Sequence, residues 1–196
     1  MTSSINSEAL NQIFTNARTH NAWLKKSVDP DLLKKVWNLA KMGPTSANCS
    51  PARIIFVLSK DAKERLKPCL IKENIEKTMS APVTAIIGSD QEFYNRLGEL
   101  FPHTDARSWF VGNDDLIVST AFRNSSLQGA YFMLAARALG LDCGPISGYD
   151  NKKVDSIFFN GANIKSNFLC NIGFGSGKDM FERSPRLDFD VACQVL

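Results

Sequence analysis

The stretch from Gly43 to Arg53, G-P-T-S-A-N-C-S-P-A-R, concentrates small polar side chains between two prolines. Pro44 and Pro51 each fix one backbone dihedral and disfavour helix at the preceding residue, so the segment has little freedom to lose when a ligand binds. Its hydroxyls and carboxamide supply donors and acceptors without net charge, which suits the edge of a neutral heterocycle better than a phosphate or a metal ion. The same residue types also form ordinary turns. The composition therefore predicts either a binding loop or a plain connection.

The other residues capable of chemistry exclude several reaction classes. His20 and His103 are the only histidines, which argues against a His-rich metal site or an imidazole relay. The five cysteines are scattered and never occur at C-x-x-C spacing, so neither a zinc site nor a disulfide framework is indicated. The chain also lacks the phosphate-loop, zinc-protease and hydrolase motifs. Difficult chemistry is therefore expected to come from an organic cofactor.

Length and charge indicate a single globular domain over residues 1–196. An apolar share of 44% in 196 residues suffices for a substantial core. The net charge of +3 is modest and the basic residues are dispersed, so neither nucleic acid nor a membrane is expected as a partner. No window approaches the roughly 20 apolar residues of a membrane span, and residues 1–25 lack the apolar core of a signal peptide. A cytoplasmic location is expected.

The elements that would position the polar residues include both helices and strands. Apolar periodicity predicts helices over 7–20, 30–43, 61–70, 72–80, part of 91–107, 114–139 and a short stretch after 150. Apolar runs rich in β-branched residues predict strands over 54–58, 82–88 and 167–173. The segment 127–139 is apolar on most faces, which predicts burial on all sides, and the glycines and prolines of 141–149 predict a turn. One α+β domain is the expected class.

Five short motifs occur in an order that matches a known family. They are Arg18-Thr19-His20 at the end of the first helix, Pro44-Thr45-Ser46 with Asn48, Asn74 with Lys77, Pro145-Ile146-Ser147-Gly148, and Arg183 near the C-terminus. On these motifs the chain resembles the FMN-dependent nitroreductase family over nearly its whole length. The resemblance implies a central, mostly antiparallel sheet flanked by helices, and a long buried helix at a homodimer interface with two FMN molecules between the subunits.

The resemblance also implies which residues bind the cofactor. They are Arg18, Thr19, His20, Pro44, Thr45, Ser46, Asn48, Asn74, Lys77, Pro145, Ile146, Ser147, Gly148, Arg183 and Arg186. The basic members would hold the FMN phosphate through charge-assisted hydrogen bonds. His20 and Asn74 would reach the pyrimidine ring or the ribityl chain, and the loop from Pro44 to Asn48 would arrive from the partner subunit. The backbone N–H groups near Ser147 and Gly148 would point at flavin N5, the atom that accepts and donates hydride.

A narrower resemblance concerns the substrate. The runs Asp105–Phe110 and Ala121–Ser126 are similar to those of reductases in this family that act on malonic semialdehyde in pyrimidine degradation. This implies reduction of 3-oxopropanoate to 3-hydroxypropanoate with NADH or NADPH as hydride donor. Arg107, Arg123 and Asn124 are the candidate substrate-binding residues.

Less specific interpretations remain open at each of these positions. Arg18 at a helix end also suits a partner of the helix dipole, Lys77 suits a solvated face, and Arg107 and Arg123 equally suit structural ion pairs. Two alternatives to the malonic semialdehyde activity also stand. One is a broad nitro or quinone reductase of the same fold, and the other is a flavin-binding or scaffold protein without turnover.

Overall fold

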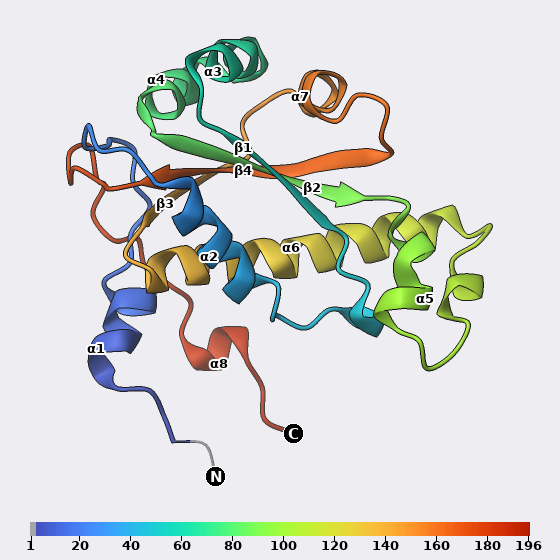
Figure 1. Cartoon of the computed structure of the whole chain (residues 1–196). Coiled ribbons are helices and arrows are strands. Elements are labelled where there is room, and N and C mark those ends of the chain that lie inside the picture. The colour runs from blue at the N-terminus through green and yellow to red at the C-terminus, as the bar shows by residue number, and fades with distance from the viewer. Residues whose placement is uncertain (1–2) are drawn as a thin grey trace.

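The structure is a computed structural model that describes residues 3–196. A four-stranded antiparallel sheet forms its centre (Figure 1). The strands lie in the order β1-β2-β4-β3 and comprise β1 (Ala52–Val57), β2 (Val83–Asp90), β3 (Asp142–Ile146) and β4 (Ile164–Gly173). β2 is buried along almost its whole length, which explains why Ala85, Ile86 and Ile87 follow one another in its sequence instead of alternating with polar residues. The strands predicted near 54–58, 82–88 and 167–173 are confirmed.

Helices cover both faces of the sheet (Figure 1). One face carries α2 (Pro30–Ala40) and α6 (Asp114–Ala138), and the other carries α3 (Lys60–Leu66), α4 (Lys72–Ser80) and α7 (Asn151–Phe158). Shorter helical segments are α1 (Ser7–Leu10), η1 (Asn11–Thr15), η2 (Ser46–Asn48), η3 (Lys67–Cys69), η4 (Phe93–Arg96), α5 (Leu97–Leu100), η5 (Ala106–Trp109) and α8 (Phe189–Ala192). Within the described residues, no helix combines the length and the apolar character that crossing a membrane requires.

Side chains on the two faces of β2 belong to two different hydrophobic clusters. Val83, Ala85 and Ile87 pack in the cluster that includes residues of α2 and α6, whereas Ile86 packs in the cluster of α3 and α7. This alternation follows from the two-residue period of a strand. Because both clusters are closed by helices, the sheet is a rigid platform from which the connecting segments project.

Capping residues define the starts of α2 and α6, which begin where the helices over 30–43 and 114–139 are predicted to begin, although α2 ends earlier, at Ala40. Asp29 accepts a hydrogen bond from the backbone N–H of Asp31, and Pro30 occupies the first helical position. Asn113 caps α6 in the same way, and Gly140 follows the helix with a φ of 78°. These local signals place the start of the loop after α2 and the start of β3 after α6.

The helix predicted over residues 7–20 is wrong in its second half. Regular helix ends at Leu10, a π-helical turn continues to Thr15, and Thr19 then forms a parallel bridge with Cys143 of β3. The apolar spacing that continues to Ala17 is therefore overridden by pairing with a strand more than a hundred residues away. Arg18 to His20 lie beyond the helix, alongside the sheet.

The turn predicted over residues 141–149 is also wrong, because Asp142–Ile146 form β3. Pro145 lies opposite Cys170 of β4 within this strand. Since β3 is the edge strand of the sheet, a residue without an N–H is tolerated there. Gly144 permits close approach of the first segment, because a Cβ at this position would lie 2.4 Å from the carbonyl oxygen of His20.

The long helix predicted over 114–139 is confirmed as α6, but its burial on all sides is wrong for the single chain. Its inner face is buried against the sheet, α2 and the segment around α5. Large apolar side chains are exposed on two flanks of α6, with Val118 (57%) and Phe122 (57%) on one flank and Leu127 (45%) and Tyr131 (40%) on the other. Exposed apolar side chains of this size are typical of interaction surfaces.

Candidate functional site

A basic cavity lies between the first segment of the chain, the end of α6 and the C-terminal tail. Its volume is about 640 Å³, and its lining residues are Phe14, Thr15, Ala17, Arg18, Thr19, Asn21, Arg137, Phe181, Glu182, Arg183, Ser184 and Arg186. The structure thus brings together three of the predicted cofactor-binding cations, although more than 160 residues separate Arg18 from Arg183. Glu182 is the one carboxylate among the described residues that line this cavity.

Guanidinium groups tie the C-terminal tail to the first segment at this cavity. Arg183 Nη2 donates to the carbonyl oxygens of Thr15 at 2.5 Å and Ala17 at 3.1 Å, and Arg18 donates to the carbonyl oxygen of Phe181. These acceptors are neutral, so they orient the guanidinium groups without compensating their charge. The arrangement favours an anionic occupant.

His20 is held next to this cavity by β3 and by the segment after β4. Its Nε2 lies 3.3 Å from Asp142 Oδ1, and Asp142 also accepts the backbone N–H of Gly175 at 2.8 Å. A Cβ on Gly175 would lie only 1.9 Å from His20 Nδ1, so glycine is required for the imidazole to occupy this place. The His20 side chain is only 12% exposed. Asp142, which orients the ring, was missed by the sequence analysis.

Asn74 connects α4 to the segment that follows β3. Its Nδ2 donates to the carbonyl oxygen of Gly148 at 2.8 Å, and the backbone N–H of Ile71 donates to the same oxygen at 3.3 Å. A Cβ on Gly148 would lie 2.4 Å from Ile71 Cδ1 and 2.6 Å from Asn74 Nδ2. The close packing fixes the chain path at Gly148, whereas the side chain of Ser147 is exposed.

Lys77 is placed differently from the predicted arginines. Its carbonyl oxygen accepts a 3.0 Å hydrogen bond from Trp23 Nε1, which joins α4 to the segment after His20. The Lys77 side chain is half-buried and does not belong to the lining of the basic cavity. Trp23 was missed by the sequence analysis, and its position four residues after Thr19 gave no signal for this contact.

The polar loop from Pro44 to Asn48 lies elsewhere in the same chain. In Figure 1 it runs beside α5, at the end of the sheet opposite to α1 and α4. Three non-glycine residues in this loop and just after it have positive φ: Ala47 (48°), Asn48 (50°) and Ser50 (39°). Such conformations cost free energy and persist only where neighbouring groups hold them. A single chain therefore does not bring this loop to the basic cavity.

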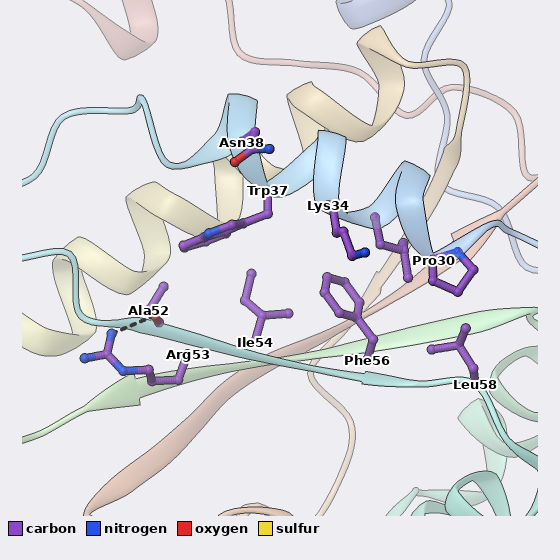
Figure 2. A pocket seen from close by; sticks show the side chains of 10 residues that line it. Pro30, Lys34, Trp37, Asn38, Ala52, Arg53, Ile54, Phe56 and Leu58 are labelled. Atoms are coloured by element: carbon purple, nitrogen blue, oxygen red, sulfur yellow. Dashed lines mark hydrogen bonds between the residues drawn. The ribbon is translucent and has the colours of Figure 1, made fainter.

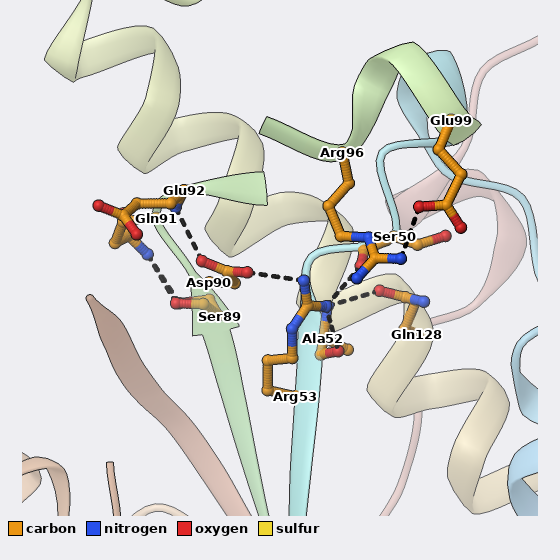
Figure 3. A network of polar contacts seen from close by, with 10 residues as sticks. All are labelled: Ser50, Ala52, Arg53, Ser89, Asp90, Gln91, Glu92, Arg96, Glu99 and Gln128. Atoms are coloured by element: carbon orange, nitrogen blue, oxygen red, sulfur yellow. Dashed lines mark hydrogen bonds and ion pairs between the residues drawn. The ribbon is translucent and has the colours of Figure 1, made fainter. Parts of the chain in front are cut away.

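Side chains from α6 and from the sheet hold this loop in place. Asn124 Oδ1 accepts the backbone N–H of Ser46 at 2.8 Å, and Gln128 Oε1 accepts the backbone N–H of Ala52 at 2.8 Å. Figure 3 shows the network at the end of the loop, where Arg53 pairs with Asp90 at 2.6 Å. Arg53 Nη1 also donates to the carbonyl oxygens of Ser50 and Ala52, each at 3.0 Å. The loop is thus preorganised by buried amides and an ion pair.

The three predicted substrate-binding residues have different surroundings. Asn124 is 1% exposed, and its Nδ2 donates to the carbonyl oxygen of Thr120 at 2.8 Å, so both ends of its carboxamide are engaged. Arg107 lies over the ring of Tyr94 at 5.8 Å and donates to Asn95 Oδ1 at 3.2 Å. Arg123 is exposed on α6. The structure thus gives Asn124 a role in holding the loop.

Replacing Asn124 by alanine is expected to loosen the loop more than it destabilises the fold. The variant removes the acceptor for the Ser46 N–H, a loss of about 1 kcal/mol of net stabilisation. Hydrogen exchange of the Ser46 amide should become faster, while the amides of β2 stay protected. Ser119→Ala, which removes an exposed hydroxyl from the same helix, is the matched control. Equal exchange at Ser46 in both variants would contradict the role assigned to Asn124.

A second cavity is apolar and carries none of the predicted cofactor-binding residues. Figure 2 shows this groove of about 750 Å³ between α2 and β1, where Trp37 and Pro30 face Ile54 and Phe56. Its lining contains few groups that recognise a polar ligand. It is therefore separate from the candidate site.

The described residues provide neither an activated thiol nor a cluster of metal-ligating side chains at the site. Cys49 in the polar loop is 1% exposed, and burial raises its pKa to about 11, which disfavours the nucleophilic thiolate at neutral pH. Within the described part of the chain, no group of three or more histidine, cysteine or acidic side chains is arranged to hold a metal ion. The candidate site is one of cations and polar donors.

Comparisons with known proteins bear on the whole chain. The model of the family described as "Nitroreductase family" matches residues 15–176. A Burkholderia lata protein with a provisional NADH dehydrogenase/NAD(P)H nitroreductase name is 61% identical, covering 97% of this chain and 98% of the relative. A Polynucleobacter asymbioticus protein with the same kind of name is 56% identical over 100% of both chains.

A solved structure shares the fold at low sequence identity. It is a provisionally named nitroreductase of Exiguobacterium sibiricum in complex with FMN, with a TM-score of 0.86, 19% identity and coverage of 100% of both chains. This similarity shows that the two proteins share the arrangement of sheet and helices. Membership of a family is shown by the family model and by the two close relatives. Since they match along nearly the whole chain, the chain belongs to the nitroreductase family.

Proposed function

We propose that the protein is an FMN-dependent NAD(P)H oxidoreductase, one domain over residues 1–196, that works as a homodimer with FMN at the subunit interface. The observation that carries the proposal is the basic cavity, where Arg18, Arg183 and Arg186 meet from opposite ends of the chain. FMN is the ligand of the structurally similar Exiguobacterium protein, and both close relatives carry NAD(P)H in their names. An anionic cofactor needs such fixed cations.

The residues present fit the parts of FMN. Arg18, Lys77 and Arg183 would hold the phosphate, with Arg186 as a second candidate, although the Lys77 side chain lies outside the cavity lining of the single chain. His20, oriented by Asp142, and Asn74 would donate to or accept from the polar edges of the ring system and ribityl chain. Thr19 and the segment from Pro145 to Gly148 would provide backbone contacts.

Bound FMN would supply the capacity to accept a hydride from nicotinamide and pass it to a substrate. The task of this chain is then to orient both partners. The backbone at Gly148 is the part best restrained for this task, because the carbonyl oxygen of Gly148 accepts hydrogen bonds from both Asn74 Nδ2 and the Ile71 N–H. That restraint leaves the backbone N–H groups of Ser147 and Gly148 in a defined position from which to meet the reactive edge of the ring.

A homodimer accounts for the two features that one chain leaves incomplete. The polar loop from Pro44 to Asn48 lies at the opposite end of the sheet from the basic cavity, so a second subunit would have to bring it to the cofactor. The exposed apolar side chains of α6, which include Phe122 and Tyr131, offer surface for that subunit. Size-exclusion chromatography with light scattering tests this directly, because a monomer would leave the loop without a cofactor to contact.

For the substrate we propose 3-oxopropanoate, reduced to 3-hydroxypropanoate. Support comes from the runs Asp105–Phe110 and Ala121–Ser126, and the carboxylate would meet Arg107 or Arg123, both of which are exposed. The relatives' names favour a second candidate, a broad nitro or quinone reductase. A flavin-binding or scaffold protein without turnover is the alternative outside enzymes.

One series of spectra separates these functions. The purified protein is expected to be yellow, to bleach on anaerobic addition of NADPH or NADH, and to recover its colour when 3-oxopropanoate is added. Recovery with nitroaromatics or quinones but not with the aldehyde would favour the broad reductase. A flavin that neither nicotinamide bleaches would indicate a non-catalytic flavoprotein, and the absence of flavin binding would indicate a scaffold.

Alanine at Arg18 or at Lys77 is expected to weaken FMN retention. Each variant would lose one charge-assisted contact, on the order of 1.5–3 kcal/mol. Flavin occupancy after dialysis, read from absorbance, measures the effect. Arg96→Ala serves as the control, because Arg96 pairs with exposed Glu99 away from the cavity. Lys77 provides the sharper test, since its side chain lies outside the cavity lining in the single chain.

A further inference from the structure

We propose that Arg137 is a further ligand of the anion in the basic cavity, and that this anion is a phosphoryl group. The identity of the group as the FMN phosphate rests on the function proposed above. Arg137 stands in the last turn of α6 and lines the same cavity as Arg18 and Arg183.

The backbone around Arg137 is fixed against the first segment of the chain. Gln12 Nε2 donates to the carbonyl oxygen of Arg137 at 2.8 Å. This contact holds the end of α6 beside η1, so the base of the Arg137 side chain has a defined position relative to Thr15 and Arg18. A guanidinium on a fixed helix end loses little freedom when it binds.

The Nε of Arg137 lacks a partner inside the protein. Among residues 3–196 it is the one buried side-chain nitrogen or oxygen without a hydrogen bond. A buried N–H of a charged group without an acceptor costs free energy, and folded proteins rarely leave one so. A ligand acceptor that reaches this N–H when the cavity is filled would resolve the deficit.

The charge balance of the cavity indicates the kind of ligand. Four arginines line it, namely Arg18, Arg137, Arg183 and Arg186, against the single carboxylate of Glu182 among the described lining residues. A phosphoryl group carries close to two negative charges and three terminal oxygens, so it can accept from several guanidinium groups at once. A carboxylate carries one charge and two oxygens, which leaves more of the positive charge unbalanced.

The experiment compares FMN with riboflavin, which lacks the phosphate, on the flavin-free protein. Arg137→Gln is expected to weaken FMN binding roughly tenfold, equivalent to about 1.4 kcal/mol, with riboflavin affinity unchanged. Arg137→Lys keeps the charge but has no Nε–H, so its affinity for FMN should lie between those of the wild type and Arg137→Gln. Arg96→Gln is the control on an exposed arginine outside the cavity. Quenching of flavin fluorescence on binding provides the measurement without turnover.

Each outcome decides the inference. Equal losses for FMN and riboflavin would assign Arg137 a purely structural role, and unchanged FMN affinity would overturn the inference directly. If wild type binds neither flavin, the proposed function fails, and titration with inorganic phosphate followed by ³¹P NMR takes over. Weaker phosphate binding by Arg137→Gln would then support the anion ligand, whereas equal or absent binding would overturn it.

Discussion

The free energy of unfolding is expected to rise between pH 7 and pH 10 because of Lys63, and replacing Lys63 by methionine should remove most of this rise. Lys63 lies on α3 and is only 5% exposed. Its Nζ donates to the carbonyl oxygen of Thr78 at 2.8 Å and to Thr84 Oγ1 at 2.6 Å, and both acceptors are neutral. Burial without a compensating charge lowers the Lys63 pKa from 10.5 to about 7.

The sign of the effect follows from proton binding. Between pH 7 and pH 10.5 the unfolded chain keeps the Lys63 proton while the folded chain has lost it, so stability rises with pH in this window. The slope is about 1.4 kcal/mol per pH unit, and the whole shift is worth on the order of 5 kcal/mol. Below pH 7 both states are protonated, and the contribution of Lys63 no longer changes with pH.

Urea unfolding at pH 7, 8, 9 and 10 measures this prediction, with flavin content matched between samples. Other lysines and tyrosines titrate near pH 10, so the informative quantity is the difference in unfolding free energy between wild type and Lys63→Met. Methionine also leaves the Thr78 carbonyl without its partner, but that offset does not depend on pH. Lys60→Met, on the exposed start of α3, is the control. Parallel curves for wild type and Lys63→Met would refute the lowered pKa.

Lys63 also illustrates what the sequence leaves hidden. It stands in a charged, helix-compatible stretch, and nothing in that stretch distinguishes it from the exposed lysines around it. Its burial depends on Thr84 of β2 and Asn171 of β4, which form the other side of the network. A side chain whose environment is built by distant strands gives no local signal.

Local signals, by contrast, were sufficient for the long elements. The helices predicted over 30–43 and 114–139 and the strand predicted over 82–88 occur as α2, α6 and β2, because the residue pattern of each of these elements reflects its own burial. The failures came where tertiary pairing decides the structure. β3 contains Gly144 and Pro145, which indicate a turn locally, but pairing with β4 holds the strand.

The cofactor site shows the same division. The order of short motifs predicted that Arg18 and Arg183 both bind the cofactor, and in the structure both residues line one cavity. Arg137 was missed, although it is the only charged residue in the apolar segment 127–139, a signal that a closer inspection of that helix would have found. Asp142 was missed because only the folded chain sets it beside His20.

Alanine at Gly144 is expected to damage both the fold and the candidate site. A Cβ there would lie 2.4 Å from the carbonyl oxygen of His20 and 3.2 Å from Trp23 Cζ2. The nearer atom belongs to the backbone, which is held by a 3.0 Å hydrogen bond from the His20 N–H to the Cys143 carbonyl oxygen. Relief therefore requires the segment to move off β3. We expect a loss of about 3 kcal/mol or more of stability, at the upper end for overpacked positions.

The displaced segment carries Arg18, Thr19 and His20, so Gly144→Ala should also lose flavin on purification, beyond what a stability change alone produces. Gly98→Ala is the matched control, because no atom lies within 4 Å of a Cβ there and the position is within α5. That variant should keep wild-type flavin and gain roughly 0.5–1 kcal/mol from the lower chain entropy of alanine. Unfolding free energies and the ratio of flavin to protein absorbance measure both effects. Wild-type values for Gly144→Ala would mean that the first segment does not pack on β3, and the basic cavity would then lose the strand that positions it.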